Sequence, residues 1–160
     1  PVDQAQKASD LLKQMGTPCL IHQPSYSMFN RWVEDSLLDV LEKEGVGCIP
    51  FSPLAQGLLT DRYLNEIPSD SRAAKPHGFL TEDRVILMLP QIKKLNEIAV
   101  NRGQSLSQMA IAWLLKDKRI TSVLIGASSV LQLENNLGAL KNKKFSSEEL
   151  EEIESVLKTD

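Results

Sequence analysis

The stretch Val46-Gly47-Cys48-Ile49-Pro50-Phe51-Ser52-Pro53-Leu54-Ala55-Gln56-Gly57 decides the fold of this chain. Its first six residues form a short apolar run, which is typical of a strand that is buried on both faces. The small and polar residues after Phe51 predict a loop at the carboxyl end of that strand. Ligands gather at the carboxyl ends of parallel strands, so this loop is the first candidate for a binding site.

The alternation of strand and helix continues on both sides of this stretch. The short apolar runs 18–23 and 122–125 predict two further buried strands. Apolar residues at helical spacing predict helices at 3–15, 31–43, 81–100, 105–116, 129–140 and from 146 towards the end of the chain. Strands that alternate with helices indicate a parallel α/β sheet wrapped in helices.

The predicted helices carry three finer expectations. Pro90 lies inside 81–100, and because proline lacks an N–H donor we expect a break or a new helix start there. The helix at 129–140 is expected to be buried through four apolar side chains, Val130, Leu133, Leu137 and Leu140. Capping boxes are predicted at two helix starts, by Ser105 with Gln108 and by Ser146 with Glu149.

Composition and charge exclude several classes of partner. The chain has 160 residues, 42% hydrophobic and 24% charged, as in ordinary globular domains. A formal net charge of -3 argues against nucleic acid and against an anionic membrane, both of which require a concentrated basic face. The longest apolar run, 85–89, is far shorter than the ~18 residues of a membrane span. We therefore expect a cytoplasmic protein without a nucleic-acid or membrane partner.

The cysteines and the start of the chain give two further expectations. Cys19 and Cys48 lie in apolar runs without Cys-x-x-Cys spacing or a nearby histidine pair, so they are expected to be small buried hydrophobes and no metal site is predicted. The chain begins at Pro1, without Met, in the approach to a helix. That start is expected of a fragment.

The turn Gly126-Ala127-Ser128-Ser129 after the third run opens a predicted helix and has two interpretations. Small residues leave the free N–H groups of a helix start accessible, and the helix dipole adds positive charge, so the turn suits a phosphate group. Ser129 with Gln132 is equally the spacing of an ordinary capping box, which needs no ligand. The spacing alone leaves both interpretations open.

Three motifs in this order resemble the aldo-keto reductase superfamily, namely 22–31 (HQPSYSMFNR), 51–63 (FSPLAQGLLTDRY) and 123–136 (VLIGASSVLQLENN). Within it, the likeness is to the branch that holds bacterial glyceraldehyde-3-phosphate-type reductases and potassium-channel β subunits. The resemblance covers essentially the whole chain. It implies an α/β fold that is the C-terminal half, about three strand-helix units, of a (β/α)8 TIM barrel, with 1–160 as one partial domain.

The resemblance also implies NADP as the cofactor and a set of residues that hold it. Gln23 matches the glutamine that hydrogen-bonds the nicotinamide carboxamide, and Phe51 matches the aromatic residue that stacks on the nicotinamide ring. The loop around the pyrophosphate is matched by Ser52, Pro53, Leu54, Gln56 and Gly57, and the basic positions that close over it by Arg62 and Arg72. The site for the 2′-phosphate and adenine is matched by Gly126, Ser128, Gln132, Asn135 and Asn136.

The family's catalytic Asp-Tyr-Lys-His tetrad lies in the first half of its barrel, and no stretch of this chain matches it. We therefore assign no catalytic residue here. His22 is predicted to be a buried histidine and His77 a solvated one, and neither is expected to be catalytic.

Two functions follow from the resemblance. The first is NADPH-dependent reduction of a small-molecule aldehyde or ketone by the full barrel, with this chain as the cofactor-binding half and inactive alone. The alternative is a nucleotide-sensing regulatory subunit of the channel β-subunit type. A half-barrel exposes strand edges and an apolar face, so a separate N-terminal half or a second copy is the expected partner.

Overall fold

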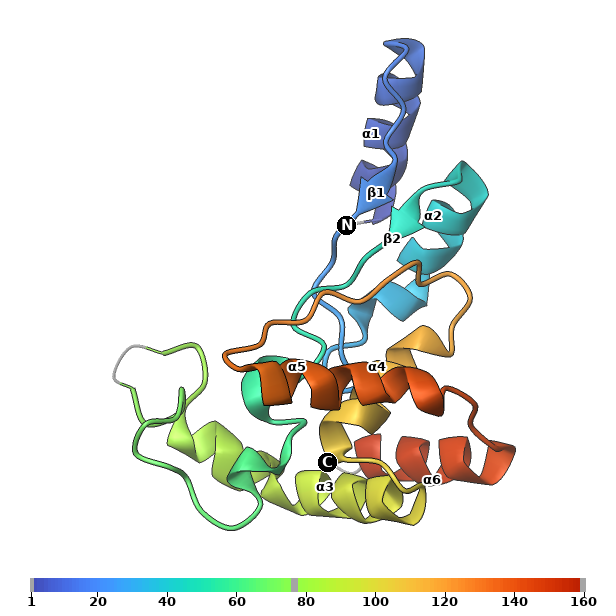
Figure 1. The fold of residues 1–160 in the computed structure, drawn as a ribbon. Helices are drawn as coiled ribbons and strands as arrows, with labels where there is room; N and C mark the ends of the chain where they lie inside the picture. The colour runs from blue at the N-terminus through green and yellow to red at the C-terminus, as the bar shows by residue number, and fades with distance from the viewer. Residues whose placement is uncertain (1, 76–77, 159–160) are drawn as a thin grey trace.

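A computed structural model describes residues 2–75 and 78–158 (Figure 1). His77, predicted as a solvated histidine, lies outside the described residues. In chain order the elements, with η for a 3-10 helix, are α1 (Val2–Gln14), β1 (Ile21–His22), η1 (Trp32–Asp35), α2 (Leu37–Glu44), β2 (Gly47–Cys48), η2 (Ala55–Gly57), η3 (Asp61–Tyr63), α3 (Glu82–Asn101), α4 (Leu106–Leu115), α5 (Val130–Leu137), η4 (Gly138–Lys141) and α6 (Ser147–Leu157). All six predicted helices are present, two of them with an added 3-10 segment.

The sheet is parallel, as predicted, but much shorter than the apolar runs. β1 and β2 pair over two residues each, Ile21 with Gly47 and His22 with Cys48. Beyond the strands the two segments stay together, because the N–H of Phe51 donates to the carbonyl of Pro24 at 2.9 Å. The loops that follow the two strands therefore start side by side.

The third predicted strand, 122–125, is not formed as a strand. The segment does run beside β2, since the N–H of Thr121 donates to the carbonyl of Cys48 at 2.8 Å and that of Leu124 to the carbonyl of Pro50 at 2.9 Å. Only one isolated bridge, between Cys48 and Ile120, joins the two segments. The prediction was wrong in this detail because the segment is extended but lacks the consecutive ladder pairs that define a strand.

The prediction that the strands are fully buried was also wrong. Leu20 is 76% exposed, Ile21 54% and Leu124 39%, whereas Cys48 is fully buried. The helices cover one side of the sheet, and within the described chain no second layer covers the other. The apolar side chains of these runs therefore lie partly on a face of the sheet that no other element of the described chain covers.

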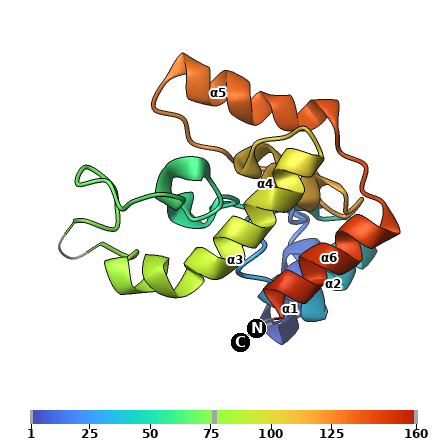
Figure 2. The same cartoon turned by 90° about the horizontal axis from the view of Figure 1, so that it is seen from below.

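The core lies between helices on the covered side. Figures 1 and 2 show α4 in the middle, with α5 on one side and α3 on the other, and α6 beside α3. Trp113, Met109 and Leu114 of α4 are at most 1% exposed. They pack with α2, α3 and α6 side chains in one apolar cluster, which fixes the helix layer under the carboxyl ends of the strands.

Both predicted capping boxes are confirmed, at the starts of α4 and α6. The predicted break at Pro90 is not found, because α3 is one continuous helix from Glu82 to Asn101. Pro90 is exposed, so its ring projects outward while the apolar side of α3 packs on the core. That packing holds the helix together despite the missing N–H donor.

The predicted burial of α5 and its extension is wrong. The four side chains expected in the core are largely exposed, Val130 at 71%, Leu133 at 41%, Leu137 at 50% and Leu140 at 54%. Asn136 and Ala139 are buried in their place. The helix therefore rests on α4 through small and polar residues, and its apolar side faces away from the described core.

Candidate functional site

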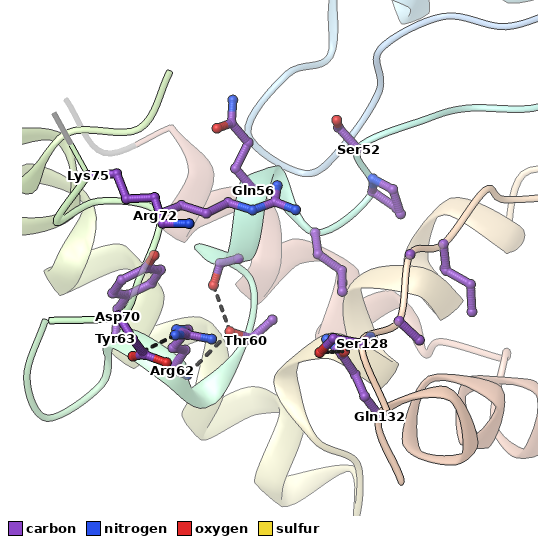
Figure 3. Close-up of a pocket in the computed structure, with 16 residues that line it drawn as sticks. Ser52, Gln56, Thr60, Arg62, Tyr63, Asp70, Arg72, Lys75, Ser128 and Gln132 are labelled. Atoms are coloured by element: carbon purple, nitrogen blue, oxygen red, sulfur yellow. Dashed lines mark hydrogen bonds and ion pairs between the residues drawn. The ribbon is translucent and has the colours of Figure 1, made fainter. Parts of the chain in front are cut away.

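A cavity of about 610 Å³ opens where the loops after β2 and after the segment 122–125 meet (Figure 3). It is lined by Ser52, Pro53, Leu54, Gln56, Gly57, Thr60, Arg62, Tyr63, Asp70, Arg72, Lys75, Ile125, Gly126, Ala127, Ser128 and Gln132. These residues come from two regions far apart in sequence, 52–75 and 125–132. The volume is that of a small-molecule or cofactor site.

The loop 52–57 has an unusual backbone. Three residues other than glycine adopt the left-handed conformation, Ser52 at φ 56°, Ala55 at φ 46° and Gln56 at φ 61°, and Gly57 follows at φ 104°. Such conformations cost energy and cluster at functional sites. Mixed left- and right-handed turns bring successive N–H groups to one side, and this arrangement can bind an anion.

Thr60 connects this loop to the next part of the cavity. Its hydroxyl donates to the carbonyl of Gly57 at 2.7 Å and accepts from the N–H of Arg62 at 3.2 Å, which caps η3. The start of η3 is therefore fixed relative to the 52–57 loop, and Arg62 projects from it into the cavity wall.

One wall of the cavity is charged. Arg62, Arg72 and Lys75 contribute three cations, and Asp70 contributes one anion. The guanidinium of Arg62 and the carboxylate of Asp70 form an ion pair at 2.9 Å. Figure 3 shows these four side chains on the same side of the cavity. The wall keeps an excess of positive charge, which favours an anionic ligand.

The opposite wall is the neutral start of α5. The hydroxyl of Ser129 accepts from the N–H of Gln132 at 3.2 Å, so Ser129 is the predicted cap. The Gln132 carboxamide oxygen does not close a box on Ser129, because it accepts from the N–H of Ser128 at 2.7 Å and from its hydroxyl at 3.1 Å. The helix start is thus satisfied from within the chain, while its polar groups still face the cavity.

Ten of the fourteen residues predicted to bind cofactor line this cavity. The other four are Gln23, Phe51, Asn135 and Asn136. Gln23 directly follows β1 and is exposed, and Phe51 is 43% exposed on the neighbouring segment. Both residues therefore lie at the carboxyl end of the sheet, where Phe51 directly precedes the cavity loop and Pro24, the neighbour of Gln23, is hydrogen-bonded to Phe51.

Asn135 and Asn136 lie on the side of α5 that faces the helix layer. The Asn135 amide donates to the hydroxyls of Ser105 and Ser107 at 3.2 and 3.0 Å, and its carbonyl oxygen accepts from Gln108 at 3.1 Å. It therefore joins α5 to the start of α4. Asn136 is 2% exposed, and its Nδ2 has no hydrogen-bond partner among the described residues.

Six lining residues were not predicted, Thr60, Tyr63, Asp70, Lys75, Ile125 and Ala127. Asp70 and Lys75 lie in the polar stretch between η3 and α3, which has no helical or strand periodicity. Charge in a long loop beside a predicted binding loop was the only available signal for them.

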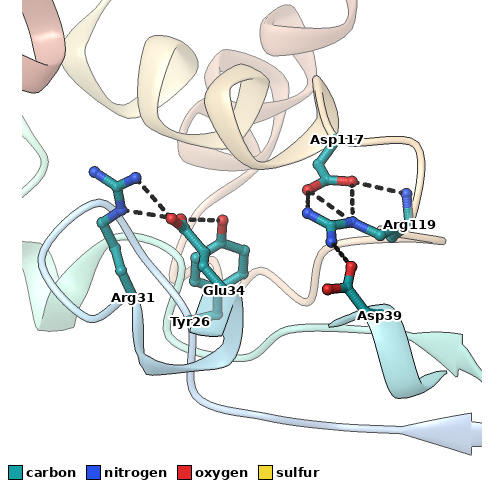
Figure 4. A network of polar contacts seen from close by, with 6 residues as sticks. All are labelled: Tyr26, Arg31, Glu34, Asp39, Asp117 and Arg119. Carbon is teal, nitrogen blue, oxygen red and sulfur yellow. Dashed lines mark hydrogen bonds and ion pairs between the residues drawn. The ribbon is translucent and has the colours of Figure 1, made fainter. Parts of the chain in front are cut away.

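A second polar network fixes the segment that follows Gln23 (Figure 4). The buried Tyr26 hydroxyl donates to Glu34 at 2.7 Å, and Arg31 donates to Glu34 at 2.6 and 2.9 Å and to Glu154 of α6 at 2.7 Å. Burial favours the neutral form of Glu34, but hydrogen bonds from Arg31 and Tyr26 outweigh it and lower the pKa of Glu34. Burial and the bond to Glu34 raise the pKa of Tyr26.

In this network the Tyr26 hydroxyl is directed to Glu34, and Tyr26 is not among the residues that line the cavity. Partial burial lowers the pKa of His22.

In the described ranges 2–75 and 78–158, no group of three His, Cys, Asp or Glu side chains could hold a metal ion. No helix there is long and apolar enough to cross a membrane.

Two curated relatives are similar to this chain over most of its length. The L-glyceraldehyde 3-phosphate reductases of Escherichia coli O157:H7 and of Escherichia coli strain K12 are each 53% identical over 95% of this chain. The match covers 45% of each of those proteins, so the chain spans about half the length of the relatives it matches.

Two solved structures share its fold. A thermostable aldo-keto reductase in complex with the inhibitor epalrestat aligns at a TM-score of 0.64 with 26% identity, over 92% of this chain and 43% of that chain. The glycerol dehydrogenase of Gluconobacter oxydans aligns at a TM-score of 0.69 with 20% identity, over 98% of this chain and 54% of that one, which is evidence of fold alone. These alignments confirm the predicted fold class, part of a (β/α)8 barrel. The model of the aldo/keto reductase family matches residues 1–158, and the chain belongs to that family.

Proposed function

We propose that this chain is the cofactor-binding part of an NADP-dependent reductase that converts an aldehyde or ketone to an alcohol. The observation that carries the proposal is the 610 Å³ cavity, which places a left-handed loop, a wall of three cations and the start of α5 around one space. A dinucleotide with a pyrophosphate and a 2′-phosphate needs these three kinds of partner.

Charge and shape of the cavity fit such a cofactor. Arg62, Arg72 and Lys75 outnumber Asp70 on the charged wall. The N–H groups of Ala55 and Gly57 donate within the loop, so neutral donors to the cofactor would have to come from its other N–H groups. When bound, the cofactor would supply the hydride. Gln23 and Phe51, both exposed at the carboxyl end of the sheet, are the residues we assign to orienting and stacking the nicotinamide.

Proton transfer to the carbonyl oxygen needs a proton donor, and none of the tyrosine and histidine side chains in the described ranges is suited to that role. Tyr26 donates to Glu34, Tyr63 is 2% exposed, and His22 has a lowered pKa. We therefore assign the general acid to the part of the barrel outside this chain, and we expect the 160 residues alone to bind cofactor without turnover. The names of the relatives suggest a small phosphorylated aldehyde as the substrate.

The exposed apolar surfaces support an incomplete barrel. Leu20 and Ile21 at the sheet and Val130 and Leu131 on α5 are each more than half exposed. Large apolar patches of this kind are covered in a stable protein. We propose that the N-terminal half of the barrel covers them, and that a second copy does so when that half is missing.

The test is calorimetric titration of the 160-residue chain with NADPH, with folding checked by circular dichroism. We expect saturable binding, and we expect Arg72→Ala to weaken it about five- to tenfold, as for loss of a charge-assisted contact to phosphate. Arg84→Ala is the matched control, because Arg84 is exposed on α3 and does not line the cavity. A folded chain that binds no NADPH would contradict the proposal.

A further inference from the structure

Among the described residues that line the cavity, Asp70 is the one carboxylate, and the other charged side chains favour anions. Its oxygen accepts from the Arg62 guanidinium at 2.9 Å, and the two side chains are 82% and 44% exposed. Of the four charged side chains on this wall, Asp70 is the only one that a phosphate group would repel. A residue that opposes the ligand of its own cavity needs a physical explanation.

We propose that Asp70 is an internal competitor for the phosphate of the ligand: it holds Arg62 in the empty cavity and gives it up when a phosphate-bearing molecule binds. The proposal rests on the proposed function only in assuming that the cavity takes phosphate groups. Because the Arg62–Asp70 ion pair is exposed to water, it is weak, and breaking it costs little free energy. Asp70 thus keeps Arg62 near its working position and also limits the affinity for the ligand.

Gln132 on the neutral wall shows why the carboxylate is special. Its carboxamide oxygen occupies the N–H and hydroxyl of Ser128, as Asp70 occupies Arg62. An amide also carries donors, so Gln132 can turn and donate to a phosphate. An ionised carboxylate has acceptors only, so Asp70 has to move away from Arg62 when a phosphate binds there. The affinity limit is therefore assigned to Asp70, and removal of its charge is the decisive change.

The consequence is faster release of the ligand. When the ligand begins to leave, the Asp70 carboxylate competes for the same guanidinium and stabilises the empty state. Removing the charge should then slow dissociation more than it speeds association, since most affinity differences within one site arise from dissociation.

The experiment compares Asp70→Asn with wild type, using inorganic pyrophosphate and NADPH as separate probes, by calorimetry and stopped-flow. We expect Asp70→Asn to tighten binding of both probes about three- to fivefold, the size of an exposed ion pair, with slower dissociation. Asp61→Asn is the matched control, because Asp61 is also exposed, lies next to Arg62 and does not line the cavity. It should leave both affinities unchanged.

A double-mutant cycle tests whether the effect acts through Arg62. In the Arg62→Ala background, Asp70→Asn should change affinity less than about twofold, because the competition is gone. Weaker or unchanged pyrophosphate binding in Asp70→Asn would overturn the inference, and so would failure of both forms to bind pyrophosphate. Tighter pyrophosphate binding together with no NADPH binding would uphold the inference and reject the proposed function.

Discussion

Helices α4 and α5 begin with the same type of serine cap, but α4 is buried and α5 is largely exposed. Each starts after a serine whose hydroxyl accepts from the N–H three residues later, and each is rich in apolar side chains. Eight residues of α4 are buried, whereas α5 buries only Asn136. Local sequence therefore specifies that both helices form, and the neighbouring elements alone decide which one is in the core.

The difference has a structural cause. α4 contacts α3, α5 and η4, so it is enclosed from several directions. α5 contacts α4 and η4, and in the described ranges nothing packs on its apolar side. At the same time the first turn of α5 forms a cavity wall. Helix α4 is thus enclosed in the core, whereas α5 has an exposed apolar side and a first turn that lines the cavity.

The comparison predicts its largest effect at Trp113. The Trp113 ring is 1% exposed, lies edge-on to Tyr26 with centroids 5.9 Å apart, and has the Lys116 ammonium 3.7 Å from its centroid. Trp113→Ala should lower the free energy of unfolding by about 3–5 kcal/mol, measured by urea denaturation. Leu131→Ala on α5, at 76% exposure, should change it by less than about 0.5 kcal/mol.

Trp113→Phe keeps the measurement informative if Trp113→Ala does not fold. It retains a ring and should lose less stability than the alanine variant while still losing more than Leu131→Ala. Equal losses at Trp113 and Leu131 would mean that α5 is as well packed as α4, contrary to the structure.

A smaller loss of stability is expected from a substitution at Glu34, which belongs to the buried, α4 side of the comparison. Its folded pKa is lowered, so its contribution to stability is fully present above the unfolded value of about 4.5 and is lost as the pH falls through the folded value. Glu34→Gln should therefore destabilise the chain by about 1–2 kcal/mol at pH 7, as for partly exposed charged hydrogen bonds. The difference from wild type should shrink below pH 4.

Unfolding midpoints measured across pH 3–7 test this prediction. Glu66→Gln is the control, since Glu66 is exposed in the loop after η3 and has no part in the network. A Glu34→Gln deficit that stays constant with pH would show that the effect is one of packing and not of charge.

The smallest effect on stability, and a large one on association, is expected on the apolar side of α5. Leu131→Lys with Leu137→Lys should leave the unfolding free energy within about 0.5 kcal/mol of wild type per site. If a second copy covers this side, the variant should shift the chain towards monomer by light scattering. Phe79→Lys is the control, because Phe79 is 97% exposed and lies in the loop before α3, not on α5. Equal association of all three proteins would remove α5 from the interface.

The helices could be predicted from sequence because their apolar spacing and serine caps are local signals. Burial could not, since the apolar residues of 129–140 look the same whether the covering layer lies inside the chain or outside it. For the same reason the runs 18–23 and 122–125 predict buried strands. The structure leaves them short and half-open, because strands are completed by neighbours.

The cavity was predicted through the resemblance and not through local pattern. No rule would place Ala55 and Gln56 in the left-handed region, where glycine or asparagine is usual. Asp70 and Lys75 were missed because a long aperiodic loop brings them to the wall. The cofactor contacts of all fourteen residues stay predictions, since lining a common cavity is a matter of geometry alone.

The alkylation rates of the two thiols can be used to measure how often the sheet opens. Cys48 is fully buried between β1 and the segment around Ile120, and burial raises its pKa to about 11. Its alkylation must await separation of these segments, since only a thiolate in contact with water reacts. Cys19 is half-buried, so we expect it to react in the folded state and to serve as the internal reference. If an N-terminal half covers the open face as we propose, adding it should lower the ratio of the Cys48 labelling rate to the Cys19 labelling rate.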